Sequence, residues 1–224
     1  MLKRLLSYIR PQVVATFESA ISGTLEVVVE RGKLILNTAN TNYSYGNLQR
    51  VLYSGLQAIG IQKIRKMRNV LLLGVGAGSV IDSLYREIGF DGKVTAVDLD
   101  PVVLEVAQRY FNLKAFENVI VIADDANNYV NSCTHRYDLI IVDVFCDYTM
   151  PGFLFDAKFW ANLHRLSNSG YILFNCILSQ ENAPKINNII TLLEAYNRDV
   201  QFLSKIEEKN DLLIAHPVKN ISSF

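Results

Sequence analysis

From Asn69 onward, short apolar runs alternate with segments of helical spacing, and this alternation limits the fold more than any other feature. The apolar runs are continuous rather than mixed with polar residues, which is typical of strands buried on both faces of a parallel sheet. Strands are expected at 70–73, 93–97, 119–122, 139–142 and 171–174. Helices are expected at 80–88, 101–111, 126–131, 156–166 and 183–196. This order predicts a doubly wound, Rossmann-like α/β domain with a parallel sheet.

The segment before this alternation has a different pattern. Residues with β-branched or aliphatic patterns occupy three runs, 13–17, 24–30 and 33–37. Gly32 can supply the positive φ of a tight hairpin between the second and third runs. A polar loop is expected at 40–47, followed by a helix at 48–59 that stops near Gly60.

The C-terminal segment predicts how the sheet is completed. Runs at 200–205 and 212–216 are expected to form a closing antiparallel hairpin. Together these patterns predict an N-terminal β-hairpin appendage over residues 1–47 and a Rossmann-like domain over residues 48–224.

Composition excludes several classes of function. The chain has 22 basic and 22 acidic residues, so no overall positive field would attract nucleic acid or anionic lipid. Three cysteines and three histidines lack the spacing of a zinc site, and such cysteine usage suits a reducing, cytoplasmic compartment. The first apolar run is too short for a signal core or a membrane span. We therefore expect a soluble cytoplasmic protein with no metal, no membrane partner and no nucleic-acid partner.

A glycine-rich loop, GVGAGS, follows the first strand of the alternating region. Gly74, Gly76 and Gly78 would let the backbone turn sharply and let a ligand approach the start of the next helix. A dinucleotide fingerprint also has glycine or alanine at the sixth position, where this chain has Ser79. The loop therefore predicts a nucleotide or nucleoside ligand and weakens the nicotinamide interpretation.

Carboxylates follow the next two strands. Asp98, with the adjoining Leu99, is expected to hold a ribose, because an acid at this strand end can accept both hydroxyls. Asp100 precedes proline and is expected to cap the following helix. Asp125 and the adjoining Ala126 could contact an adenine, but capping the next helix is an equally good interpretation of Asp125.

A further carboxylate, Asp143, ends the fourth strand. It can face the reacting centre as a general base or position a cation, and as a base it would need a raised pKa to work near neutral pH. The alternative is a helix cap or a structural hydrogen bond to the glycine loop. Residues 145–151 are expected to cover the site.

With these elements, the stretch from Val70 to Phe174 resembles the spermidine synthase family within the class I S-adenosylmethionine-dependent transferases. The stretches that carry the resemblance are VLLLGVGAGSV, VDLDPVVLEVAQRYF, ADDANNYV and YDLIIVDVF. The resemblance implies binding of S-adenosylmethionine or its decarboxylated form, with Asp143 as the catalytic aspartate. It also implies a catalytic role for Tyr45 and a possible homodimer.

Three departures from the family pattern concern the half of the site that would hold a polyamine. Ala77 stands where the family has an aspartate in the glycine loop, and Gly46 replaces the polar neighbour of Tyr45. Three residues after Asp143 the chain has Cys146, with Asp147 one place late. These departures favour a methyltransferase acting on a small molecule. Spermidine synthase-type aminopropyl transfer and a non-catalytic nucleoside-binding protein remain the alternatives.

Overall fold

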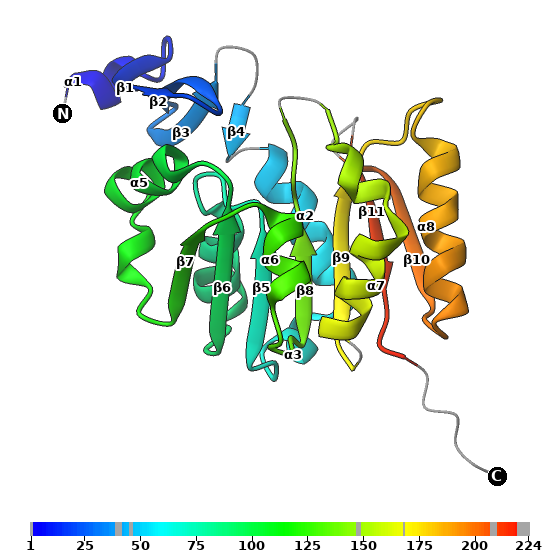
Figure 1. Ribbon diagram of the computed structural model, residues 1–224. Coiled ribbons are helices and arrows are strands. Elements are labelled where there is room, and N and C mark those ends of the chain that lie inside the picture. The colour runs from blue at the N-terminus through cyan, green and yellow to red at the C-terminus, as the bar shows by residue number, and fades with distance from the viewer. Residues whose placement is uncertain are drawn as a thin grey trace.

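The computed structural model describes residues 2–38, 42–44, 47–146, 149–167, 169–206 and 210–218 (Figure 1). Its larger sheet has seven strands in the order β10-β11-β9-β8-β5-β6-β7. Five of them run parallel to one another: β5 (Asn69–Leu73), β6 (Lys93–Asp98), β7 (Val119–Ala123), β8 (Leu139–Val142) and β9 (Tyr171–Cys176). The last two, β10 (Val200–Ile206) and β11 (Asn210–Ala215), form an antiparallel hairpin that pairs with β9. The predicted doubly wound sheet with a closing hairpin is confirmed.

Helices cover both faces of this sheet, as its continuous apolar strands require. One face packs against α2 (Asn47–Ile59) and the helical stretch that follows the glycine loop. The opposite face packs against α6 (Ala126–Ser132), α7 (Ala157–Leu166) and α8 (Ala183–Ala195). In Figure 1, α6 and α7 lie in front of the sheet and α2 lies behind it.

The strand order places a switch point between β5 and β8. From β5 the chain runs outward through β6 and β7 and then returns to β8 on the other side of β5. Ligands of open α/β sheets bind at such a point, outside the carboxyl ends of the strands. The loop after β5 contains the glycines, and the loop after β8 begins with Asp143. The topology therefore brings two of the predicted site segments next to each other.

A separate sheet at the N-terminal end has the order β1-β2-β3-β4. Its strands are β1 (Gln12–Ser19), β2 (Gly23–Glu30), β3 (Lys33–Thr38) and β4 (Asn42–Ser44). The predicted turn between β2 and β3 is confirmed, with Arg31 and Gly32 both at positive φ. The polar loop expected at 40–47 is partly wrong because β4 pairs with β3.

The N-terminal sheet packs against α5 (Pro101–Tyr110), as Figure 1 also shows. Leu25 and Leu36 are fully buried in an apolar cluster with Val103, Val106 and Ala77 of the glycine loop. At the edge of this contact, the Ser19 hydroxyl donates a hydrogen bond to a carboxylate oxygen of Asp100. The appendage thus rests on the helix that begins beside Asp98.

Short helical features near the N-terminus and after the glycine loop differ from the sequence predictions. A five-residue helix, α1 (Leu2–Leu6), precedes β1, and a short helix, α3 (Ile61–Ile64), follows α2. The helix expected at 80–88 consists of α4 (Ser79–Asp82) followed by a π-helical segment (Ser83–Ile88). A periodic apolar pattern does not distinguish these hydrogen-bonding patterns, because the same side chains face the core in both.

Candidate functional site

The glycine loop after β5 has the backbone that the sequence predicts. Gly74, Gly76 and Gly78 have φ angles of +87°, +53° and +83°, in the region that side chains other than glycine's disfavour. At Gly74 a Cβ would also collide with the backbone carbonyl oxygen of Asp143. The loops after β5 and β8 therefore lie in backbone contact, and only a residue without a Cβ fits at position 74.

Asp98 at the end of β6 holds this loop in place by hydrogen bonds. One carboxylate oxygen of Asp98 accepts hydrogen bonds from the backbone N–H groups of Val75 (2.8 Å) and Gly76 (3.2 Å). The other oxygen accepts from the N–H of Asp100 at 3.0 Å. Burial raises the pKa of Asp98, the three N–H donors oppose that rise, and the charge of Asp100 adds to it. The second oxygen retains a lone pair, which is what the predicted ribose contact would use.

Leu99, expected beside the ribose, has 51% of its side chain exposed at this strand end. Asp100 caps α5, accepting from the Val102 N–H at 2.8 Å, with Pro101 in the first turn. The predicted capping role of Asp100 is confirmed. The exposed Leu99 therefore offers an apolar surface beside the largely buried carboxylate of Asp98 at the carboxyl edge of the sheet.

Asp125, which follows β7, caps the helix α6 and is also the residue predicted to contact adenine. Asp125 accepts from the Asn128 N–H at 2.9 Å and begins α6. Asp124 in turn accepts from the Asp125 N–H at 2.8 Å, and Ala126, the first residue of α6, is buried. Capping by Asp125 is therefore present, and it occupies only one of the two carboxylate oxygens. Adenine contact by Asp125 and Ala126 stays a prediction.

Asp143 follows β8 and is partly buried. Its N–H continues the strand ladder to the Leu73 carbonyl at 2.8 Å. Its side chain accepts from the Asn175 amide nitrogen at 2.8 Å. Burial raises the pKa of Asp143 from its ordinary 3.8 to about 6, opposed by the Asn175 hydrogen bond and reinforced by the charge of Asp98. A carboxylate with this pKa is ionised at neutral pH and is a stronger base than an ordinary aspartate.

Sequence reasoning missed Asn175 and its partner Asn210. Asn175 is fully buried near the end of β9, and its amide oxygen accepts from the Asn210 amide nitrogen at 3.0 Å. The available signal was the single polar residue in the apolar run YILFNC. A polar side chain at the carboxyl end of a buried strand indicates a specific partner, because burying an amide without hydrogen bonds is costly.

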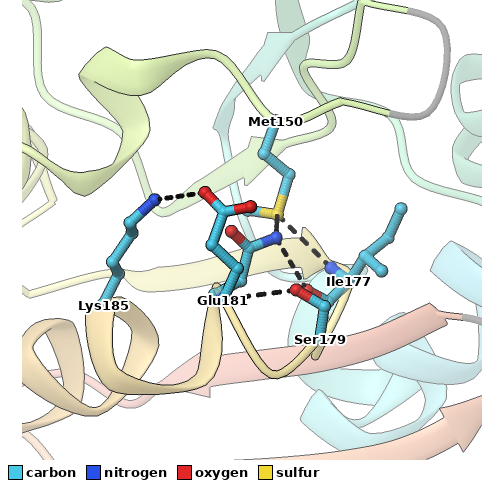
Figure 2. Close-up of polar contacts among 6 residues, drawn as sticks. Met150, Ile177, Ser179, Glu181 and Lys185 are labelled. Carbon is cyan, nitrogen blue, oxygen red and sulfur yellow. Dashed lines mark hydrogen bonds and ion pairs between the residues drawn. The ribbon is translucent and has the colours of Figure 1, made fainter.

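The loop after Asp143 is anchored to the loop after β9. Cys146 and Thr149 exchange backbone hydrogen bonds of 2.9 Å and form an isolated antiparallel bridge. The Met150 sulfur then accepts from the Ile177 N–H (3.4 Å) and lies 3.8 Å from the Asn182 amide nitrogen. Figure 2 shows Met150 reaching toward Ile177 and the turn before α8. These contacts hold Met150, near the end of the 145–151 loop, against the segment between β9 and α8.

Two residues with predicted or proposed roles lie outside the described residues: Tyr45, expected to be catalytic, and Asp147, one place after the family carboxylate. Ala77 is described and is fully buried in the apolar cluster beneath the N-terminal sheet. No charged side chain therefore occupies the position of the family's loop aspartate.

The described part of the chain has neither a cluster of metal-binding side chains nor a membrane-spanning helix. No group of three or more His, Cys, Asp or Glu side chains there could hold a metal ion. Within the same residues, no helix has both the length and the apolar character needed to cross a bilayer.

Comparison with known proteins gives a family match. Residues 51–214 match the model of the spermine/spermidine synthase domain. An eEF1A lysine and N-terminal methyltransferase homolog of Drosophila pseudoobscura pseudoobscura is 30% identical over 114 residues, covering 46% of this chain and 16% of that protein. A polyamine aminopropyltransferase of Vibrio vulnificus is 32% identical over 114 residues, covering 49% of this chain and 38% of that protein. The chain thus spans less than half the length of these curated relatives.

A solved structure supports the fold independently. A probable spermidine synthase from Corynebacterium glutamicum superposes with a TM-score of 0.72 at 18% identity, covering 95% of this chain and 83% of that chain. At this identity the similarity establishes the architecture and nothing finer.

Proposed function

The chain belongs to the spermine/spermidine synthase domain family, and on that premise we propose that it is an S-adenosylmethionine-dependent methyltransferase acting on a small molecule. The observation that carries the proposal is the junction at the switch point of the sheet. There a loop of three positive-φ glycines, held in place by Asp98, touches the backbone of Asp143. Few structural roles require a partly buried base with a raised pKa against a glycine-rich loop, whereas a transferase site does.

The nucleoside half of the ligand would lie across the ends of β5, β6 and β7. Gly74, Gly76 and Gly78 would let the amino-acid tail and ribose approach the backbone. Asp98 would accept a ribose hydroxyl through its free lone pair, and the exposed Leu99 would contact the base. Asp125 and Ala126 would bound the adenine at the next strand end.

S-adenosylmethionine, when bound, supplies a methyl group made electrophilic by a sulfonium cation. Asp143 would then accept the proton that the acceptor gives up as it is methylated, because its pKa of about 6 leaves it ionised at neutral pH. Its negative charge would also favour a cation nearby. Tyr45, at the family's position, would contribute to the acceptor side.

Methyl transfer is favoured over aminopropyl transfer by the surroundings of position 77. Ala77 is buried among Leu25, Leu36 and Val103, so the loop presents no carboxylate to the ligand's tail. A carboxylate there would repel the carboxylate of S-adenosylmethionine and attract the bare ammonium of its decarboxylated form. Without it, the site has lost the feature that would select the aminopropyl donor.

Aminopropyl transfer is the second candidate. The aminopropyltransferase relative and the retained Asp143 favour it. The two candidates differ in donor and acceptor, so the same assay separates them.

The acceptor is proposed to be a small molecule, and amines are the first class to test. The relatives' names specify lysine, an N-terminus or a polyamine as the group modified. The purified chain would be incubated with methyl-labelled S-adenosylmethionine and a panel of small amines, with short peptides as a comparison. Decarboxylated S-adenosylmethionine with a diamine would be run in parallel, and Asp143→Asn would serve as the inactive control.

Labelled small amines that depend on Asp143 would support the proposal. Label transferred to peptides alone would replace the small-molecule acceptor by a protein. Product formed only from the decarboxylated donor would overturn methyl transfer in favour of the second candidate.

Two further expectations belong to this proposal. The N-terminal sheet is proposed to pair two copies of the chain, because β1 lies at its edge and Tyr8 and Ile9 nearby are 68% and 84% exposed. The mass in solution, measured by light scattering, would test this.

A cytoplasmic location is proposed because Cys133, Cys146 and Cys176 are all free thiols.

A further inference from the structure

An asparagine pair behind Asp143 forms a directed chain of hydrogen bonds. Asn175 Nδ2 donates to Asp143 Oδ1 at 2.8 Å, and Asn210 Nδ2 donates to Asn175 Oδ1 at 3.0 Å. The three residues come from the loop after β8, from β9 and from the start of β11. These hydrogen bonds therefore reach Asp143 from the β9 side of β8, whereas the glycine loop follows β5 on the other side of β8.

The direction of this chain is fixed by chemistry. An ionised carboxylate only accepts hydrogen bonds, so Asn175 must turn its NH₂ group toward Asp143. The Asn175 oxygen then faces away and needs a donor, which the Asn210 NH₂ group provides. If Asn175 turned over, its oxygen would face the Asp143 carboxylate and its NH₂ group would face that of Asn210. The first contact would be repulsive unless Asp143 bound a proton, and the second would be repulsive unless Asn210 turned over as well.

We infer that Asn175 and Asn210 are positioning residues that fix the orientation of the Asp143 carboxylate and keep it in its ionised, proton-accepting form. Asn175 acts directly through its hydrogen bond, and Asn210 acts by preventing Asn175 from turning over. Asn175 is fully buried, so its amide group depends on these two hydrogen bonds rather than on solvent. The catalytic meaning of this arrangement rests on the proposed function, whereas the hydrogen-bond chain itself does not.

Other titratable groups around Asp143 act in different ways. Asp98, across the switch point, raises the pKa of Asp143 by its negative charge. The thiol of Cys176, next to Asn175, has its pKa raised to about 12 by burial and by Asp211, so it stays protonated and neutral. Asp211 is bound to the N–H groups of Leu178 and Lys205. Among the groups that the structure describes, only the Asn175 amide is identified as lowering the pKa of Asp143.

The test measures the ionisation of Asp143 directly in the 224-residue chain. Carboxyl-labelled aspartate would be incorporated, the Asp143 signal assigned by its loss in Asp143→Asn, and its titration followed by ¹³C NMR. In Asn175→Leu, a variant of similar size without the donor, the pKa of Asp143 should rise by about one, since a hydrogen bond to a charged group has about this effect. Asn210→Ala should raise it less, in the same direction. Asn118→Leu, which removes an exposed side-chain amide bound to the Asp91 carbonyl and not to Asp143, should leave it unchanged.

The kinetic counterpart is the acid side of the pH profile of kcat/KM. It should move to higher pH in Asn175→Leu, with the rate largely recovered above pH 8, which a general loss of structure would not produce. An unchanged or lowered Asp143 pKa in folded Asn175→Leu would overturn the inference. If Asn175→Leu does not fold, an unchanged pKa in Asn210→Ala, whose side chain is only partly buried, has the same force. Absence of any turnover would instead count against the proposed function, because the NMR titration needs no substrate.

Discussion

Replacing Asp143 by asparagine should make the protein more stable while it destroys activity. Burial raises the pKa of Asp143 from 3.8 to about 6. The folded state therefore binds more protons than the unfolded state between these two pH values, and the free energy of unfolding falls as pH rises through that window. Each unit of pKa difference corresponds to ~1.4 kcal/mol. Ionised Asp143 thus lowers the stability of the wild-type protein at pH 7 by about 3 kcal/mol.

Asp143→Asn removes this cost and keeps the main contact. The new amide oxygen can still accept from Asn175 Nδ2, and the side chain has almost the same size. The variant should therefore be up to about 3 kcal/mol more stable than wild type at pH 7 and nearly equal to it at pH 4, where wild-type Asp143 is protonated. If Asp143 is the base, turnover should fall by roughly 10²–10⁴.

Urea unfolding of both proteins from pH 4 to pH 7.5 measures the difference. Glu181→Gln is the matched control, because Glu181 is 83% exposed in its ion pair with Lys185 and its loss should cost less than about 1 kcal/mol. A variant that is less stable than wild type at pH 7, or a stability difference that does not grow from pH 4 to pH 6.5, would refute the reasoning. Equal turnover of the two proteins would remove Asp143 from catalysis.

Two other predictions concern the cofactor. Asp98→Ala should weaken binding of S-adenosylmethionine by about 1.5–3 kcal/mol in calorimetry, because a hydrogen bond to a charged group is lost and the glycine loop loses its fastening; unchanged affinity in a folded variant would contradict the ribose assignment. The affinity of cationic S-adenosylmethionine should rise with pH through about 6, as Asp143 ionises, whereas that of neutral S-adenosylhomocysteine should not; parallel pH dependences would show that Asp143 does not face the sulfonium.

The sheet could be predicted from the sequence because its strands are buried on both faces. Continuous runs such as Val70–Leu73 have no polar alternative, and the helices between them leave only crossover connections. The strand β4 (Asn42–Ser44) was missed for the opposite reason. It joins β3 through backbone hydrogen bonds at the sheet's edge, which leave no apolar pattern to detect.

The site was predictable only where its signals are local. Capping by Asp100 follows from Asp-Pro at a helix start, and the glycine loop follows from glycine spacing. The contacts of Asn175 join residues 32 and 35 positions apart in sequence. No local pattern encodes such pairs, because they depend on how β9 and β11 lie beside β8. The burial of Ala77 under the N-terminal sheet depends on tertiary packing in the same way.

The central claim is that this site takes the carboxylated cofactor. At ~4 Å and an effective dielectric constant near 20, a carboxylate at position 77 would act on the ligand's tail with an energy on the order of 4 kcal/mol before solvent offsets it. Ala77 carries no charge, so this repulsion of the ligand's carboxylate is absent.

Calorimetric titration of the wild-type chain with S-adenosylmethionine and with its decarboxylated form, with methylthioadenosine and NAD as references, measures the outcome. S-adenosylmethionine should bind at least as tightly as the decarboxylated form, and NAD should not compete. A strong preference for the decarboxylated form would contradict methyl transfer.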